Sequence, residues 1–228
     1  MLQTKMLEGI DGIIFDMDGT LLDSMWIWPS IDDDYLNKYQ LTKPERFHES
    51  MEGMSYPEVA QFFLDTFPGL SRTREQVMEE WMQMARDKYR TQVTMKGGVH
   101  SFIREMKSQG KRIGIATSNA RELTEDALDA LKISGLFDVV RTAGEAGAGK
   151  PAPDVYLMVA AELKVEPERC LVFEDVPMGI LAGKNAGMKV CAVEDAFSSL
   201  QRGKKKELAD YYINDYYDIS NETYEVLE

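Results

Sequence analysis

Short runs of apolar residues, each bounded by polar or turn-forming residues, recur along the chain and alternate with segments of helical periodicity. The runs are residues 13–15, 113–116, 139–140, 171–173 and 190–193. Apolar residues follow helical spacing at residues 99–108, 122–131, 155–163 and 180–186. Near-continuous apolar strands that alternate with helices ending near a glycine are typical of a parallel sheet covered on both faces. The pattern therefore predicts an α/β architecture from residue 96 onward.

The stretch between residues 24 and 94 has a different pattern. It contains no four-residue β-branched run, and its apolar residues instead recur at helical spacing. Pro29, Pro44, Pro57 and Pro68 divide it into about four helices. We therefore predict a core domain formed by residues 1–24 and 95–228, interrupted by an inserted all-helical domain at residues 25–94.

Composition and charge narrow the class of protein. The 228 residues are 44% hydrophobic and 29% charged, which is enough apolar material for a sizeable core. The formal net charge of -13 predicts a surface that repels the phosphates of nucleic acid and anionic lipid. No run approaches the length of a membrane span, and the first ten residues show no signal-peptide pattern. We therefore expect a soluble, cytoplasmic protein without nucleic-acid or membrane partners, present as a monomer or a small homo-oligomer.

Two further features have structural interpretations. Cys170 and Cys191 lie at the edges of apolar runs and belong to no metal-ligand cluster, so we expect buried free thiols. The three lysines at 204–206 are interpreted as a solvated helix face.

Polar side chains that could take part in catalysis or metal binding follow three of the apolar runs. The groups are Asp16 and Asp18 after the first run, Thr117, Ser118 and Asn119 after the second, and Glu174 and Asp175 after the fourth. Each set alone has an ordinary explanation, as a turn, a helix N-cap or the acidic start of a helix. Ligands of open parallel sheets bind outside the carboxyl ends of the strands. If these strands are neighbours, four carboxylates and a hydroxyl converge at one edge.

Such a carboxylate cluster requires a cation. Two carboxylates a few ångströms apart cannot both stay ionised without a cation or a shared proton. An all-oxygen site suits Mg²⁺, which binds one or two carboxylates together with a substrate phosphate oxygen. The sequence therefore predicts a Mg²⁺ site that allows an anionic nucleophile to approach a phosphate.

A competing motif occurs at residues 144–150, which fit the GxxxxGK pattern of a nucleotide-binding loop. The next residue is Pro151, where that loop needs a serine or threonine hydroxyl for Mg²⁺. Proline supplies neither a hydroxyl nor an amide, so we do not expect an NTPase or a kinase.

The segment 15–24, with the sequence FDMDGTLLDS, closely resembles the signature of the haloacid dehalogenase (HAD) superfamily of phosphohydrolases. The later motifs of that family follow in order: Thr117 at a strand end, Lys150 before a proline-marked helix, and Glu174 with Asp175 ahead of Gly179. The insertion after the first motif resembles the cap of the β-phosphoglucomutase-like branch. The resemblance implies a Rossmann-like parallel-sheet core and a helical cap that closes over the site.

The resemblance also implies a role for each motif residue. Asp16 would attack phosphorus and become an aspartyl phosphate, and Asp18 would act as general acid and then general base. The phosphate would be held by Thr117, Ser118 and Lys150. Mg²⁺ would be bound by Asp16, Asp175 and the backbone carbonyl of Asp18, with Glu174 acting through water.

The resemblance implies a Mg²⁺-dependent phosphatase acting on a small phosphorylated metabolite. Asp18 favours ester hydrolysis over dehalogenation, because a dehalogenase of this family lacks that residue. Two alternatives stay open: a sugar phosphomutase of the β-phosphoglucomutase type, and a catalytically silent binding or regulatory protein. Candidate specificity residues in the insertion are Trp28, Glu52, Met54 and Tyr56, each of which could equally be packing.

Overall fold

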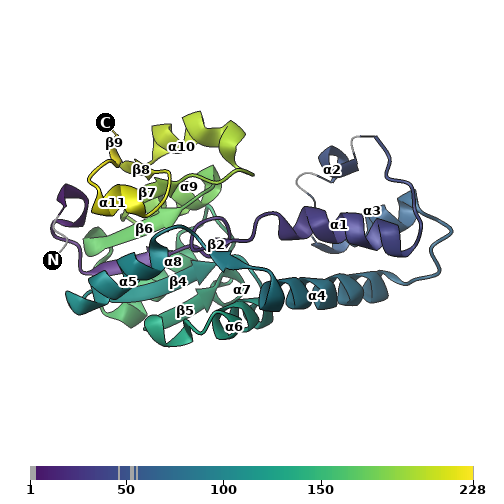
Figure 1. Ribbon diagram of the computed structural model, residues 1–228, viewed down its shortest axis with the longest axis horizontal. Coiled ribbons are helices and arrows are strands. Elements are labelled where there is room, and N and C mark those ends of the chain that lie inside the picture. The colour runs from purple at the N-terminus through teal and green to yellow at the C-terminus, as the bar shows by residue number, and fades with distance from the viewer. Residues whose placement is uncertain (1–3, 46, 52–53, 55, 228) are drawn as a thin grey trace. The chain divides into compact units, whose positions relative to one another are not determined.

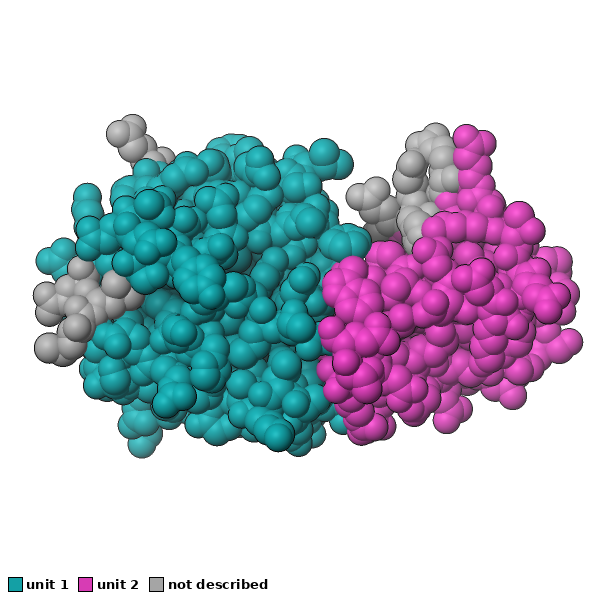
Figure 2. Space-filling model, viewed as in Figure 1, with its two compact units in different colours: residues 1–25, 93–228 teal, residues 26–92 magenta. Residues whose placement is uncertain are grey.

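The chain divides into two compact units, which Figure 2 shows in different colours. The computed structural model describes residues 4–45, 47–51, 54 and 56–227. One unit comprises Met1–Met25 with Val93–Glu228, and the other comprises Trp26–Gln92. We refer to them as the α/β unit and the helical unit.

In the described part of the chain, the α/β unit is built on a seven-stranded sheet (Figure 1). All neighbouring strands are parallel except the last pair, which is antiparallel. In spatial order the strands are β5 (Val139–Thr142), β4 (Arg112–Thr117), β1 (Gly12–Phe15), β6 (Cys170–Glu174), β7 (Lys189–Val193), β8 (Tyr211–Ile213) and β9 (Glu225–Val226).

The strands bury both faces, because alternate side chains of each strand point to opposite sides of the sheet. On one face, Ile14 and Val172 belong to a cluster with residues of α8 (Asp154–Leu163) and α9 (Pro177–Asn185). On the other face, Phe15 stacks on Phe173 with ring centroids 5.2 Å apart. Phe102 of α5 (Val99–Ser108) meets Phe173 edge-on at 5.4 Å. Packing on both faces therefore holds the residues that directly follow β1 and β6.

The remaining helices of the α/β unit connect these strands or close the sheet. They are α6 (Arg121–Ala130), α7 (Ala143–Ala146), α10 (Arg202–Leu208) and α11 (Tyr217–Ser220), with 3₁₀ turns at Lys5–Leu7, Ser134–Leu136, Pro167–Arg169 and Ser199–Gln201.

A two-stranded antiparallel ribbon lies where the chain leaves the α/β unit and returns to it. It pairs β2 (Leu22–Asp23) with β3 (Thr94–Met95). Directly after β3, Lys96 Nζ donates to Asp195 Oδ2 at 2.6 Å. Because Asp195 is buried, this ion pair fixes the returning chain to the loop after β7.

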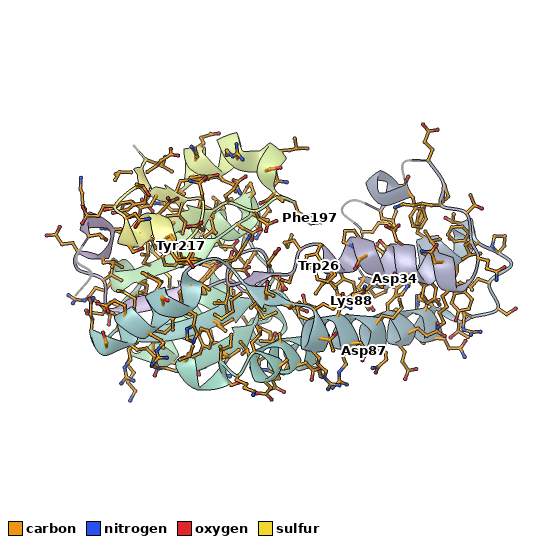
Figure 3. All side chains as sticks on the ribbon, viewed as in Figure 1. Trp26, Asp34, Asp87, Lys88, Phe197 and Tyr217 are labelled. Atoms are coloured by element: carbon orange, nitrogen blue, oxygen red, sulfur yellow. The ribbon has the colours of Figure 1, made fainter. Side chains whose placement is uncertain are left out.

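The helical unit packs around aromatic side chains. Its helices are α1 (Ile27–Lys38), α2 (Phe47–Ser50), α3 (Tyr56–Thr66) and α4 (Arg74–Thr91). Tyr35, Phe63 and Trp81 meet edge-on, with ring centroids 5.3–5.7 Å apart. Lys88 of α4 pairs with Asp34 of α1 at 2.6 Å (Figure 3). Helical spacing of apolar residues in the sequence therefore produces a small aromatic core.

The structure corrects one interpretation and confirms another. Lys205 is fully buried, and its ammonium donates to Val193 O and Ser198 Oγ, both at 3.0 Å. The interpretation of 204–206 as a solvated face is therefore wrong for Lys205, because three successive helical residues cannot all point outward. The expected free, buried thiols of Cys170 and Cys191 are confirmed.

Candidate active site

The ends of three adjacent strands bring the predicted polar residues together. β1 lies between β4 and β6, with Phe15 opposite both Ile115 and Phe173. The Asp16 N–H donates to Phe173 O at 3.0 Å, which continues the ladder by one residue. The residues that follow these three strands therefore lie at the same edge of the sheet. At this edge the chain continues to β4 on one side of β1 and to β6 on the other side, which is where ligands of such sheets bind.

Lys150 is buried between two carboxylates. Its Nζ donates to Asp16 Oδ1 and to Glu174 Oε1, both at 2.6 Å, and to Ala116 O at 3.3 Å. Its side chain is only 7% exposed. The loop before α8 thus delivers one positive charge to the acidic ends of β1 and β6.

Glu174 is held on both of its oxygens. Oε1 also accepts from the Tyr156 hydroxyl at 3.0 Å, and Oε2 accepts from the N–H of Asp175 at 2.9 Å. A Cβ at Gly179 would lie 1.7 Å from Oε1, so only glycine leaves room for this carboxylate. Glu174 therefore orients Lys150, a contact that the sequence reading did not anticipate.

Asp175 has one satisfied and one unsatisfied oxygen. Oδ1 accepts from Thr20 Oγ1 at 3.2 Å. Oδ2 is buried, and no donor among the described residues reaches it. Gly19 has φ +81°, and a Cβ there would lie 2.3 Å from Oδ2. The glycine of the first motif thus supplies a left-handed turn and space for this carboxylate.

The carboxylates repel one another in a buried setting. Burial raises the pKa of Asp16 to about 8; Lys150 opposes this shift, and the charge on Glu174 adds to it. Burial, followed by the charges on Glu174 and Asp16, raises the pKa of Asp175 well above its usual value. Burial by itself lowers the pKa of Lys150, but the negative charges of Asp16 and Glu174 outweigh this effect and raise the pKa of the lysine above its usual value. One lysine therefore leaves negative charge uncompensated.

This geometry suits a divalent cation. Oxygens of Asp16, Glu174 and Asp175 lie within 4.8 Å of one another. The unsatisfied Asp175 Oδ2 supplies an oxygen ligand without breaking a hydrogen bond. Hard oxygen donors of this kind favour Mg²⁺, Ca²⁺ or Mn²⁺ over softer metals. The donor set thus fits a metal of the predicted type.

The second aspartate of the first motif is held by two other loops. Asp18 Oδ1 accepts from Ser24 Oγ at 2.6 Å, and Oδ2 accepts from Asn119 Nδ2 at 2.9 Å. Thr117 is buried at the end of β4, and its Oγ1 accepts from the N–H of Asn119 at 3.0 Å. Ser118, between them, is exposed. Thr117 and Ser118 therefore start the loop that reaches Asp18.

Comparison with known proteins decides the family. The model of the haloacid dehalogenase-like hydrolases matches residues 13–193. The chain belongs to this family. It is 30% identical over 185 residues to the pyrophosphatase PpaX of Bacillus cereus, covering 81% of this chain and 83% of that protein.

Two more HAD relatives extend this finding. The chain is 33% identical over 195 residues to (DL)-glycerol-3-phosphatase 1, mitochondrial, of Arabidopsis thaliana, covering 82% of this chain and 65% of that protein. A solved structure of a β-phosphoglucomutase-like protein from Thermotoga maritima has a TM-score of 0.79 at 24% identity, covering 94% of this chain and 98% of that one. These relatives confirm the predicted HAD α/β fold with its helical insertion and the enzyme class, a HAD phosphatase.

Among the described residues, no helix is both long and apolar enough to traverse a bilayer. Cytoplasmic location and oligomeric state stay predictions.

Three of the four predicted specificity residues, Trp28, Met54 and Tyr56, are described and belong to the helical unit. Trp28 meets Tyr56 edge-on at 5.6 Å, and the Tyr56 hydroxyl donates to Met78 O at 2.8 Å. Met54 is 37% exposed. Glu52 lies outside the described residues. A role in substrate selection stays a prediction for all four.

The sequence reading assigned no role to two residues of this HAD site. Tyr156 follows the apolar period of α8, which is the usual pattern of a core residue, yet its hydroxyl contacts Glu174. Asn119 was placed at the strand end without a partner for its side chain. For Tyr156, the available sequence signal is a tyrosine at an apolar helix position within seven residues of the motif lysine. For Asn119, no sequence signal distinguishes the residue from an ordinary helix N-cap.

Metal binding is expected to stabilise the protein more strongly at high pH. Unfolded, the Asp16 carboxyl loses its proton near pH 3.8, whereas in the native metal-free protein it holds the proton up to about pH 8. The native state binds more protons in this interval, so its free energy of unfolding falls as pH rises. A bound Mg²⁺ would replace the proton as counter-charge, so we expect its stabilising effect to grow over the same range.

The measurement is the melting temperature with Mg²⁺ or EDTA at about pH 5 and about pH 8.5. We expect a larger Mg²⁺-dependent rise at the higher pH, and a much smaller rise in Asp175→Asn. Equal shifts at both pH values, or an undiminished shift in that variant, would contradict a metal site at these carboxylates.

Proposed function

We propose that this chain is a Mg²⁺-dependent phosphohydrolase that removes phosphate from a small phosphorylated metabolite through an aspartyl phosphate on Asp16. The observation that supports this most directly is the buried Asp16–Lys150–Glu174 arrangement beside the unsatisfied oxygen of Asp175. It combines a carboxylate nucleophile, a fixed cation and an unfilled oxygen ligand.

Asp16 acts as the nucleophile in this proposal. Its Oδ1 is occupied by Lys150 at 2.6 Å, which supports attack by Oδ2 while the lysine holds the side chain. The P–O bond to the leaving group breaks as the bond from Asp16 to phosphorus forms. Lys150 then faces the transferred phosphoryl group and stabilises its negative charge.

Thr117 and Ser118 bind the phosphoryl oxygens. Thr117 is positioned by β4, and its hydroxyl can donate as well as accept. Exposed Ser118 provides a second hydroxyl and backbone N–H at the start of the loop.

Asp18 moves the protons. It gives a proton to the departing oxygen and later takes one from the water that hydrolyses the aspartyl phosphate. This exchange returns both aspartates to their starting states.

Mg²⁺ would be held by Asp16, Asp175 and the backbone carbonyl of Asp18, with Glu174 contacting it through water. When bound, the ion neutralises charge on the carboxylates and the phosphate and so permits two anions to approach. The two backbone donors on Glu174 Oε2 and the two side-chain donors on Oε1 support contact with the ion through water.

The substrate is proposed to be small because the protein carries one buried lysine at the site and a formal net charge of -13. A long polyanion would meet repulsion beyond the site. Two of the named relatives, pyrophosphatase PpaX and (DL)-glycerol-3-phosphatase 1, carry names that specify small phosphorylated substrates.

The test is phosphate release from a panel of small phosphorylated compounds, with Mg²⁺ or with EDTA. The panel should contain inorganic pyrophosphate, glycerol 3-phosphate, hexose phosphates, nucleoside monophosphates and 4-nitrophenyl phosphate. We expect Mg²⁺-dependent release from at least one metabolite and from the aryl phosphate. Isomerisation of a hexose phosphate without release would favour a mutase, and no turnover of any compound would favour a silent protein.

A further inference from the structure

Each carboxylate oxygen of Asp18 accepts a hydrogen bond from a side chain of another segment. Oδ2 accepts from the side-chain amide of Asn119 at 2.9 Å, and Oδ1 accepts from the Ser24 hydroxyl at 2.6 Å. The Asn119 side chain comes from the loop after β4, whereas Ser24 follows β2. Two segments that are distant in sequence thus fix one side chain.

The orientation of the Asn119 amide is determined by its other contact. Its side-chain oxygen Oδ1 accepts from the backbone N–H of Ala120 at 2.8 Å. A flipped amide would place an NH₂ group against the Ala120 donor and an oxygen against the Asp18 carboxylate. The NH₂ group therefore faces Asp18.

This orientation holds the Asp18 carboxyl group through a neutral donor. The NH₂ group of Asn119 can only donate, and it carries no charge that would add to those of the neighbouring carboxylates. Asn119 therefore fixes the position of the Asp18 side chain without adding a charge beside it.

We propose that Asn119 is a positioning residue that holds the Asp18 carboxyl group where it can transfer a proton to the leaving oxygen. The inference rests on the phosphohydrolase function proposed above. As Asp16 forms its bond to phosphorus, the bond from phosphorus to the leaving oxygen breaks. The proton carried by Asp18 moves to that oxygen, so the leaving group departs as a neutral alcohol and Asp18 is left as a carboxylate.

The role predicts a dependence on the leaving group. A poor leaving group, such as phenol, needs the proton from Asp18, whereas 4-nitrophenol departs readily as an anion. The two aryl phosphates have similar shapes, so a loss of packing or of phosphate binding should affect them equally. The parameter kcat/KM reports the step that releases the alcohol.

The test is kcat/KM for phenyl phosphate and 4-nitrophenyl phosphate with wild type and Asn119→Asp. The aspartate has the same shape and can still accept from Ala120, but it cannot donate to Asp18 when ionised. We expect the variant to lose at least about 10-fold more activity on phenyl phosphate than on 4-nitrophenyl phosphate, a part of the range typical of general acid catalysis. Asn119→Ala, which adds no charge, should show the same direction.

Asn214→Asp is the matched control. Asn214 Nδ2 donates to Asp218 Oδ2 at 3.0 Å in an exposed pair, so this change removes the same kind of bond and adds the same charge. It should leave the ratio of the two activities unchanged. Melting temperatures of all variants report whether they fold.

Equal losses on both aryl phosphates, or no loss in either Asn119 variant, would overturn the positioning role. Absence of turnover by wild type on both substrates is a separate outcome. It would refute the phosphohydrolase function and this inference with it.

Discussion

Asp16→Asn is expected to reduce phosphate release by about 10⁴-fold or more, in line with the loss of other catalytic nucleophiles. A neutral amide cannot form the aspartyl phosphate, although it fills the same space at the end of β1. The fold should persist, because burial already favours the uncharged form of this side chain, whose pKa is raised to about 8. The change therefore separates chemistry from folding.

The measurement is turnover of 4-nitrophenyl phosphate combined with acid quenching and mass spectrometry of the protein. Wild type should show a phosphoryl adduct on the peptide containing Asp16, and the variant should not. Asp129→Asn, which changes an aspartate that accepts from Ser134 Oγ on the surface, is the matched control and should retain full activity. An adduct elsewhere, or substantial turnover by Asp16→Asn, would place the nucleophile at another residue.

Lys150→Met is expected to lower turnover by about 10²-fold or more, because it removes the fixed cation that faces the transferred phosphoryl group. Stability should fall as well, by about 3 kcal/mol, because two buried carboxylates lose their shared partner. The burial of Lys150 is what predicts this second effect. An exposed lysine at the same position would leave the melting temperature almost unchanged.

A double variant separates the two effects. Adding Glu174→Gln to Lys150→Met removes one uncompensated buried charge, so part of the lost stability should return while activity stays low. The measurements are urea unfolding and turnover under conditions in which each variant is folded. Lys184→Met, which removes an exposed pair with Asp210, should change neither quantity by much. Recovery of turnover together with stability would show that Lys150 has only a structural role.

Hydrophobic periodicity in the sequence was sufficient to predict the principal strands and helices. The predicted run at 113–116 lies within β4, and the helix predicted at 99–108 has the bounds of α5. The short β8 and β9 were not predicted. β8 contains only three residues, all of them buried, so it shows no alternation of apolar and polar positions. β9 contains only two residues, both exposed, and it forms a strand by pairing with β8. Their formation depends on a partner strand, which local sequence does not specify.

The local order of residues also placed Asp16, Thr117 and Glu174 after apolar runs, because strand ends are determined by nearby residues. Their convergence required β1 to lie between β4 and β6, and that order is set by the packing of helices on both faces of the sheet. Sequence alone therefore predicted which groups could serve chemistry, whereas the tertiary structure decided which of them meet.

Individual contacts show the same division. Lys150 is 134 residues from Asp16, and Asn119 is 101 residues from Asp18, so neither pairing follows from local geometry. A lysine in a loop and an asparagine before a helix are ordinary surface residues by sequence pattern. Burial between the strand ends turns Lys150 into a shared counter-ion, and the register of β1 with β4 brings Asn119 to Asp18. The sequence determines the donors and acceptors that are available, but their partners depend on the three-dimensional arrangement of strands, because hydrogen bonds and ion pairs act only at short range.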